Sequence, residues 1–149
     1  MRIAVLSDIH ANLHALEAVN LDLQNANVDA VYCLGDLVGY GAFPNEVVEF
    51  IRTNRFPTVM GSFDEAAGFQ LHEPGCRVNT VEDRIRLEEN FLWTKSVLTE
   101  ANRSFLQTLP LQIRFKVSGK RILLVHGSPR GMDEYLTPDL PGATFAQIS

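Results

Sequence analysis

Side chains that suit a divalent metal ion follow several short apolar runs of this sequence. Four of them stand out by type and place: Asp8, His10, Asp36 and His126. Carboxylate oxygens combined with imidazole nitrogens suit manganese, iron, zinc, nickel or cobalt better than calcium. The Asp-x-His spacing puts both side chains on one side of an extended backbone, because residues i and i+2 share a face. Asp36 lies in a glycine-flanked turn, where its two oxygens could approach two cations.

Each of these residues alone also has a structural interpretation. Asp8 would cap a helix that begins at residue 13, and Asp36 would form an Asx turn. His126 would be a hydrogen-bonded histidine at the edge of the core. Their joint occurrence after buried strands favours a metal or phosphate site over three separate coincidences.

The apolar spacing predicts elements that bring these side chains to one edge of a sheet. Short runs rich in β-formers predict buried strands at 2–7, 30–34 and 57–60, and helical spacing predicts helices at 13–26 and 45–54. This βαβαβ alternation predicts an α/β fold with a parallel sheet. The carboxyl ends of parallel strands line the ligand crevice of such a sheet.

The second half of the chain has a different pattern. Residues 69–79 read as an irregular excursion, followed by helices at 80–98 and 100–109 with Thr80 and Thr99 as caps. The runs 111–117 and 121–125 predict a hairpin across Ser118-Gly119-Lys120. We find no internal repeat and no linker, so a single domain over 1–149 is expected.

Composition excludes several classes of function. The 149 residues are 46% hydrophobic and 21% charged, with 13 Lys and Arg against 18 Asp and Glu and a net charge of −5. Such a balance argues against non-specific nucleic-acid binding. No apolar stretch approaches the ~20 residues of a membrane span, and the N-terminus lacks the features of a signal peptide. Two cysteines make no disulfide framework, so a cytoplasmic location is expected.

Four motifs, in order, resemble those of one known family. They are Ser7-Asp8-Ile9-His10, Leu34-Gly35-Asp36-Leu37-Val38-Gly39-Tyr40-Gly41, Met60-Gly61-Ser62-Phe63-Asp64 and Val125-His126-Gly127-Ser128-Pro129-Arg130. The chain resembles a calcineurin-like metallophosphoesterase of the small prokaryotic phosphodiesterase type. The resemblance implies an α/β fold of two packed sheets flanked by helices. It also implies that Asp8 and His10 bind one metal, that Asp36 bridges two metals, and that His126 binds the second.

The activity implied by the resemblance is hydrolysis of a phosphodiester or phosphomonoester by a metal-bound hydroxide. Two cations ~3.5–4 Å apart would clamp the phosphoryl group. Asp36 and Asp64 are the expected catalytic residues. In the family, the aspartate at the position of Asp64 orients a histidine, and this chain has no histidine there. Arg130 is expected to meet the substrate phosphate, with an ion pair to Asp133 or Glu134 as its alternative.

Three departures from the family pattern bear on activity. Ser62 replaces an asparagine ligand of the second metal, and its alternative is to cap a short helix at 63–68. Phe63 replaces the histidine that serves the leaving oxygen, so it would shape the pocket or pack on the core. The family's later Gly-His-x-His segment is absent. One ion would therefore keep three ligands, Asp8, His10 and Asp36. The other would keep Asp36 and His126, with Ser62 as a weak third ligand. We therefore expect at most about one ion to bind tightly.

The leading hypothesis is a metal-dependent phosphoesterase for small substrates, with impaired activity. The alternative is an inactive binding or scaffold module on the same fold. A metal-free nucleotide-binding domain is a third reading, weakened because no Gly-x-Gly-x-x-Gly follows the first strand. Because the family fold needs strands beyond residue 149, we expect a domain without its C-terminal part. Its second sheet should then be incomplete, with an exposed face that a second copy of the chain would cover.

Overall fold

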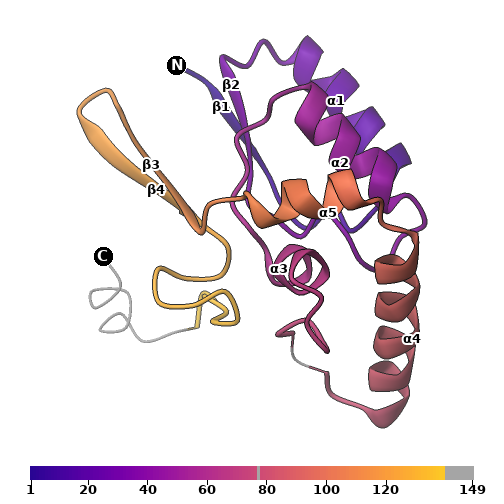
Figure 1. The fold of residues 1–149 in the computed structure, drawn as a ribbon. Helices are drawn as coiled ribbons and strands as arrows, with labels where there is room; N and C mark the ends of the chain where they lie inside the picture. The colour runs from indigo at the N-terminus through magenta and orange to yellow at the C-terminus, as the bar shows by residue number, and fades with distance from the viewer. Residues whose placement is uncertain (77, 140–149) are drawn as a thin grey trace.

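The structure is a computed structural model that describes residues 1–76 and 78–139 (Figure 1). The described residues form four strands and five helices. In chain order these are β1 (Ile3–Leu6), α1 (Leu13–Asn25), β2 (Ala30–Cys33), α2 (Pro44–Thr53), α3 (Ser62–Gly68), α4 (Val81–Val97), α5 (Glu100–Gln107), β3 (Gln112–Val117) and β4 (Lys120–Val125). The α/β prediction is confirmed, and the predicted bounds hold to within one or two residues, except at 57–60. The sequence also predicts the first turn of a helix at 144–149, and these residues lie outside the described part of the chain.

The first sheet is the parallel pair β1 and β2, joined through α1. Ile3 pairs with Ala30 and Leu6 with Cys33. Helix α1 starts where predicted because the Asn12 side chain accepts a hydrogen bond from the Ala15 N–H. Asn12, and not Asp8, is therefore the cap of this helix, which leaves the Asp8 carboxylate for another role.

The third predicted strand, at 57–60, is reduced to one parallel bridge between Cys33 and Thr58. The Pro57 carbonyl accepts from the Cys33 N–H at 3.0 Å, and the Val59 N–H donates to the Cys33 carbonyl at 3.0 Å. Proline has no N–H of its own to extend the ladder. The next donor, the Met60 N–H, turns away to the Pro110 carbonyl at 2.8 Å. The segment follows β2 in direction but leaves it too early to count as a strand.

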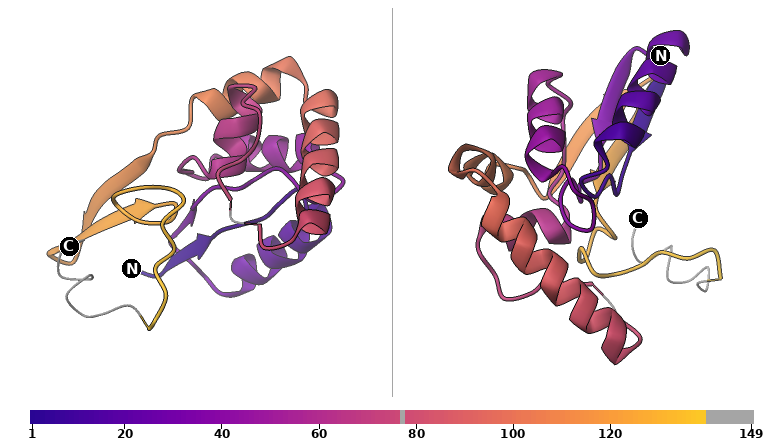
Figure 2. Two further views of the ribbon diagram at one scale, coloured as in Figure 1. Left: turned by 90° about the horizontal axis from the view of Figure 1, so that it is seen from below. Right: turned by 90° about the vertical axis from the view of Figure 1, so that its right-hand side faces the viewer.

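The second sheet is the antiparallel hairpin of β3 and β4, which pair from Gln112 with Val125 to Val117 with Lys120. The two turn residues, Ser118 and Gly119, both have positive φ, at 48° and 78°, which matches the right-handed twist of a hairpin. Figures 1 and 2 show this hairpin and α4 at opposite ends of the molecule. The fold thus has two separate small sheets, as expected for a two-sheet architecture.

The prediction that the first strand is buried on both faces is wrong. Val5 is 47% exposed, and it shares a face of the first sheet with its partner Tyr32. The Tyr32 ring stacks on Phe115 of β3, with ring centroids 4.8 Å apart and planes at 3°. The two-stranded hairpin therefore covers the Tyr32 end of this face and leaves Val5 open, which agrees with the expected incomplete second sheet.

The hydrophobic core joins helices α1 to α5 to the other face of the first sheet, which contributes Leu6 and Cys33. Its two largest fully buried side chains are Phe63 of α3 and Phe91 of α4, with ring centroids 6.1 Å apart. Thr80 and Thr99 cap α4 and α5 as predicted. Among residues 1–76 and 78–139, every helix is too short or too polar to cross a membrane.

Candidate metal centre

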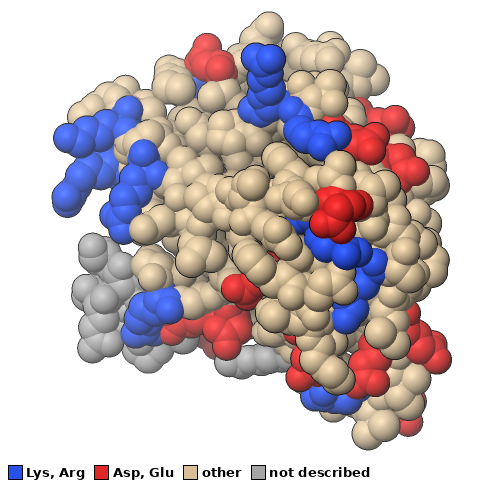
Figure 3. Space-filling view, in the orientation of Figure 1, with Lys and Arg blue, Asp and Glu red and all other residues tan. Residues whose placement is uncertain are grey.

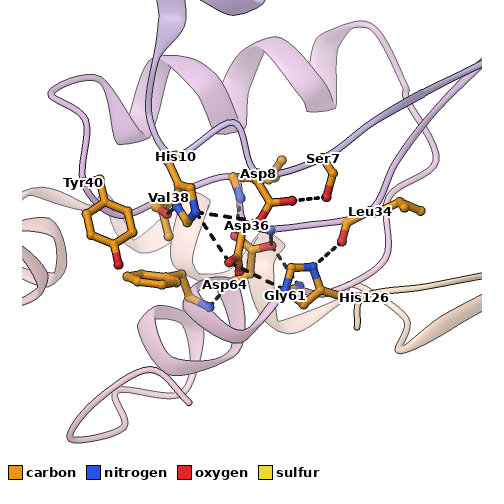
Figure 4. A network of polar contacts seen from close by, with 12 residues as sticks. Ser7, Asp8, His10, Leu34, Asp36, Val38, Tyr40, Gly61, Asp64 and His126 are labelled. Carbon is orange, nitrogen blue, oxygen red and sulfur yellow. Dashed lines mark hydrogen bonds and ion pairs between the residues drawn. The ribbon is translucent and has the colours of Figure 1, made fainter. Parts of the chain in front are cut away.

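The side chains of Asp8, His10, Asp36 and His126 converge on one point, and we call these four residues the metal-site cluster (Figure 4). Asp8 and His10 follow β1, Asp36 follows β2, and His126 follows β4. They line one cavity of about 340 Å³. The four side chains, each of which follows a strand, therefore lie together, as their positions along the sequence predict.

One oxygen of Asp36 faces both imidazoles. Its Oδ2 atom lies 3.7 Å from His10 Nε2 and 3.6 Å from His126 Nε2. Its Oδ1 atom accepts the Phe63 N–H at 2.9 Å. The expectation that two oxygens would each approach a cation therefore needs correction, because Oδ1 is occupied by the backbone and Oδ2 alone lies between the histidines.

Backbone carbonyls orient both histidines of the cluster. His10 Nδ1 lies 3.0 Å from the Val38 carbonyl oxygen, and His126 Nδ1 lies 2.7 Å from the Leu34 carbonyl oxygen. In the neutral imidazole, this contact places the proton on Nδ1 and leaves the Nε2 lone pair unprotonated. Metal-binding histidines in proteins are held in this way by their second ring nitrogen. Both Nε2 lone pairs are therefore free to bind an ion beside Asp36 Oδ2.

The backbone of the cluster is held in an unusual conformation. Asp8, His10 and Asp36 have φ angles of 55°, 46° and 55°, in the left-handed region. This region costs a non-glycine residue about 1 kcal/mol. Hydrogen bonds between the two loops hold it, because the Asp8 N–H donates to the Gly35 carbonyl at 3.1 Å and the His10 N–H to the Asp36 carbonyl at 2.9 Å. Such strain is concentrated at functional sites.

Asp64 lies beneath the cluster and not in the cavity. Its carboxylate is completely buried. Oδ2 accepts the N–H groups of Asp36 at 2.8 Å and Gly61 at 3.1 Å, and Oδ1 accepts the Leu37 N–H at 2.8 Å. Burial first, and the nearby Asp36 charge second, raise the pKa of Asp64 to about 7. Asp64 thus ties the Asp36 loop to the start of α3, which is a positioning role and differs from the catalytic role that we expected.

Ser62 is the first residue of α3 and lines the cavity, with 8% of its surface exposed. Its hydroxyl makes no hydrogen bond to any described residue. The alternative that Ser62 caps a helix at 63–68 is wrong, because the helix begins at Ser62 itself and the Gly61 N–H is satisfied by Asp64. Within the described part of the chain, the hydroxyl of Ser62 therefore has no hydrogen-bond partner at the edge of the cavity.

Phe63 does both things that the sequence suggested for it. It is buried in the core, and its ring also meets the ring of His10 edge-on, with centroids 5.0 Å apart. It lines the cavity that holds the metal-site cluster. No proton donor stands at this position, so the leaving-oxygen role that the resemblance assigns to a histidine here is vacant.

Arg130 does not reach the cavity. Its guanidinium pairs with Glu134, four residues later, through Nε at 2.9 Å and through a second, closer contact from Nη2. Glu134 also accepts from the Ser128 hydroxyl. Arg130 is not among the described lining residues of the cavity, and the alternative pairing with Glu134 is observed. A bidentate partner close in sequence keeps the guanidinium engaged.

Sequence reasoning missed two residues of the cavity. Tyr40, which the sequence analysis named only within a motif, lines it. Cys76 is half-buried and also lines the cavity. The irregular segment 69–76 returns to the cavity and brings Cys76 to its lining. The Pro74-Gly75 turn was the signal available for this return, although a turn alone does not give its direction.

Gly61 shows how closely the two loops meet. A Cβ atom at this position would overlap Asp36, at both its N and Oδ1 atoms. We expect Gly61→Ala to lower the free energy of unfolding by about 2 kcal/mol, because a buried overlap forces the backbone apart. Urea unfolding measures this. Gly75→Ala is the matched control, since a Cβ there meets nothing within 4 Å, and equal effects of the two variants would contradict the close approach.

The donor set fits a divalent ion on one side of Asp36 better than on the other. The ligand atoms of Asp8, His10 and Asp36 all lie within 4.8 Å of one another, and His10 Nε2 is 3.9 Å from Asp8 Oδ1. Two ligand atoms that share one tetrahedral ion are about 3.4 Å apart, so a small inward movement would complete this set. On the other side, His126 and Asp36 Oδ2 supply two ligands, with Ser62 nearby. Burial also raises the pKa of Asp36 above its usual value.

Comparison with known proteins gives consistent results. Residues 1–144 match the calcineurin-like phosphoesterase superfamily domain. The chain is 41% identical over 145 residues to an uncharacterized protein of Methanocaldococcus jannaschii, covering 96% of this chain and 57% of that protein. It is 36% identical to the crystal structure of a metallophosphoesterase from Sphaerobacter thermophilus, with a TM-score of 0.66, covering 91% of this chain and 51% of the other.

A hypothetical protein from Pyrococcus horikoshii shares the fold, with a TM-score of 0.75 at 23% identity, over 98% of this chain and 63% of that one. The chain therefore spans between about half and two thirds of the length of the relatives that it matches. The described residues hold the metal-site cluster within that span.

Proposed function

The chain belongs to the calcineurin-like phosphoesterase superfamily, and on this basis we propose that it is a metal-dependent phosphoesterase acting on small phosphoesters. The observation that carries the proposal is the arrangement of His10 and His126, whose Nε2 lone pairs face one oxygen of Asp36 from two sides. Nitrogen and carboxylate donors in this arrangement suit a transition metal.

The charge of the cavity supports the need for a metal. Among its described lining residues the acidic side chains are Asp8 and Asp36, and neither Lys nor Arg is present. Basic side chains gather instead over the β3–β4 hairpin (Figure 3), at Arg114, Lys116, Lys120 and Arg121. Two carboxylates repel a phosphoester anion. The cavity would therefore bind such a substrate only when cations neutralise it.

The residues of the metal-site cluster would have different roles. Asp8, His10 and Asp36 would hold one ion, and Asp36 with His126 would hold a second, weaker one. A bound divalent ion polarises phosphoryl oxygens and lowers the pKa of water. Val38 and Leu34 keep the histidine lone pairs pointed inward, and Asp64 fixes the loop from which Asp36 projects. Asp36 would then be the ligand common to both ions, and Asp64 would act through it.

The test is hydrolysis of bis(p-nitrophenyl) phosphate and p-nitrophenyl phosphate after removal of metals, with Mn²⁺, Ni²⁺ or Co²⁺ then added back. We expect slow turnover that depends on the added metal. Activity that is equal in the presence of a chelator would contradict metal dependence. Absence of turnover under all these conditions, with metal bound, would favour the alternative of a binding or scaffold module, for which Phe63 in place of a proton donor is the supporting observation.

The unequal donor sets lead to a prediction for metal stoichiometry. We expect about one tightly bound Mn²⁺ per chain in calorimetric titration, because the Asp36 and His126 side lacks a third strong ligand. Two equivalents bound with equal, high affinity would contradict this.

Ser62→Asn adds an amide oxygen where the unengaged hydroxyl now lies. It should strengthen the second binding event without changing the first. Ser96→Asn, on the exposed side of α4, is the control for adding an amide away from the site.

A further inference from the structure

The segment 38–41 surrounds the metal-site histidine His10. The Val38 carbonyl accepts from its Nδ1 at 3.0 Å, and the Gly41 N–H donates to the His10 carbonyl at 3.0 Å. Between these two contacts, the Tyr40 ring packs edge-on against the imidazole, with centroids 4.8 Å apart. The side-chain orientation and the backbone of His10 therefore both depend on this segment.

The segment does not adopt a relaxed conformation. Gly39 and Tyr40 have φ angles of 86° and 58°. Glycine tolerates such an angle, but a tyrosine in the left-handed region costs about 1 kcal/mol. Tyr40 is also 54% exposed, so burial of its side chain provides little of the restraint. Other contacts must hold its backbone in place.

Asn90 of α4 supplies a two-point contact to this backbone. Its Oδ1 accepts the Tyr40 N–H at 2.6 Å, and its Nδ2 donates to the Tyr40 carbonyl at 3.0 Å. The side-chain amide of Asn90 thus satisfies both the N–H and the carbonyl of Tyr40. This contact fixes the orientation of the peptide units on either side of Tyr40. The next residue, Phe91, is buried against Phe63, so Asn90 projects from a part of α4 that is anchored in the core.

We propose that Asn90 is a positioning residue for the metal centre, which acts through Tyr40 to hold His10 in its metal-binding orientation. The proposal rests on the proposed metal site. It is specific, because the contact runs from α4 across 50 residues of chain to the segment that brackets a metal ligand. Among the described residues, Asn90 alone hydrogen-bonds the Tyr40 backbone with its side chain.

A purely structural tie would look similar, and the chain contains one that serves as a control. Asn45 of α2 makes a similar two-point contact with the backbone, with Nδ2 donating to the Val97 carbonyl at 2.8 Å and Oδ1 accepting the Thr99 N–H at 2.9 Å. Its Oδ1 also accepts from Asn102 Nδ2 at 3.0 Å. The two-point contact joins α2 to the end of α4, and Asn45 does not line the cavity of the metal-site cluster.

The experiment compares Asn90→Ala and Asn45→Ala in two ways. The ring-nitrogen resonances of His10 are recorded by NMR in metal-free protein, and Mn²⁺ affinity is measured by calorimetry. We expect Asn90→Ala to shift the His10 resonances and to weaken Mn²⁺ binding about five-fold, less than the 10–100-fold loss typical for a direct partner of a metal ligand. Asn45→Ala should lower the unfolding temperature and leave both His10 and Mn²⁺ affinity unchanged.

Equal effects of the two variants on His10 and on Mn²⁺ affinity would overturn the proposal, as would an unchanged His10 signal in Asn90→Ala. If the unaltered protein binds no Mn²⁺, the proposed function fails, but the His10 resonances still decide whether Asn90 orients this ring. If Asn90→Ala does not fold, Asn90→Gln takes its place, because one added methylene breaks the two-point fit and retains the amide.

Discussion

Asp36→Asn is expected to abolish metal-dependent hydrolysis while leaving the protein folded. The amide oxygen can still accept the Phe63 N–H, as Oδ1 now does at 2.9 Å. The amide nitrogen then takes the place of Oδ2, between His10 Nε2 and His126 Nε2. It has no lone pair for a metal, and it donates to the very lone pairs that an ion would need.

We expect turnover to fall by about 1,000-fold or more, because the substitution removes the one ligand common to both ions. Initial rates with Mn²⁺ and calorimetric titration measure the two consequences. Asp22→Asn, an equivalent change on the exposed side of α1, is the control and should leave both unchanged. Mn²⁺ affinity within two-fold of the unaltered protein would show that Asp36 is not a ligand.

Asp64→Asn is expected to have the largest effect on stability. The carboxylate accepts three backbone N–H groups in a fully buried place. An asparagine offers one acceptor oxygen, and its NH2 group must face at least one of these N–H donors. A buried donor left unsatisfied costs about 1–3 kcal/mol, so we expect the free energy of unfolding to fall by about 3 kcal/mol.

The measurement is urea unfolding at pH 5. Burial raises the pKa of Asp64 to about 7, so the folded state keeps a proton that the unfolded state releases at about pH 4, and the unaltered protein loses stability as the pH rises between these two values. The loss caused by Asp64→Asn is therefore larger at pH 5 than at pH 8. Asp83→Asn is a suitable comparison, because Asp83 also bonds locally, to the Thr80 hydroxyl at 2.7 Å, but on an exposed helix start. A loss below about 0.5 kcal/mol for Asp64→Asn would mean that the loop of Asp36 does not depend on this carboxylate.

The sequence allowed the four residues of the metal-site cluster to be identified because of where they lie along the chain. Asp8 and Asp36 follow runs of apolar β-formers that pair as parallel strands, and such strands end at the same edge of a sheet. The position of His126 beside Asp36 was harder to predict, because His126 follows a strand of the other sheet. Its Nδ1 contact with the Leu34 carbonyl, 92 residues away, places it.

The remaining differences have identifiable physical causes. Residues 57–60 have the composition of a strand, but Pro57 withholds a donor and Met60 bonds Pro110. The Arg130 guanidinium could bind a phosphate, but Glu134 lies four residues later in the sequence and forms an ion pair with Arg130. Tyr40 and Asn90 are joined only through tertiary structure, which no local pattern reports. Long-range backbone contacts of single side chains are therefore what the sequence left open.

Anomalous diffraction from Mn²⁺-soaked crystals, recorded at the manganese absorption edge, tests the metal centre most directly. The strongest peak on the chain should lie within about 2.2 Å of both His10 Nε2 and Asp36 Oδ2, on the side that also carries Asp8. A weaker peak beside His126 would agree with the unequal donor sets. Bound manganese elsewhere, with no peak between His10 and Asp36, would contradict the proposed site and the function that depends on it.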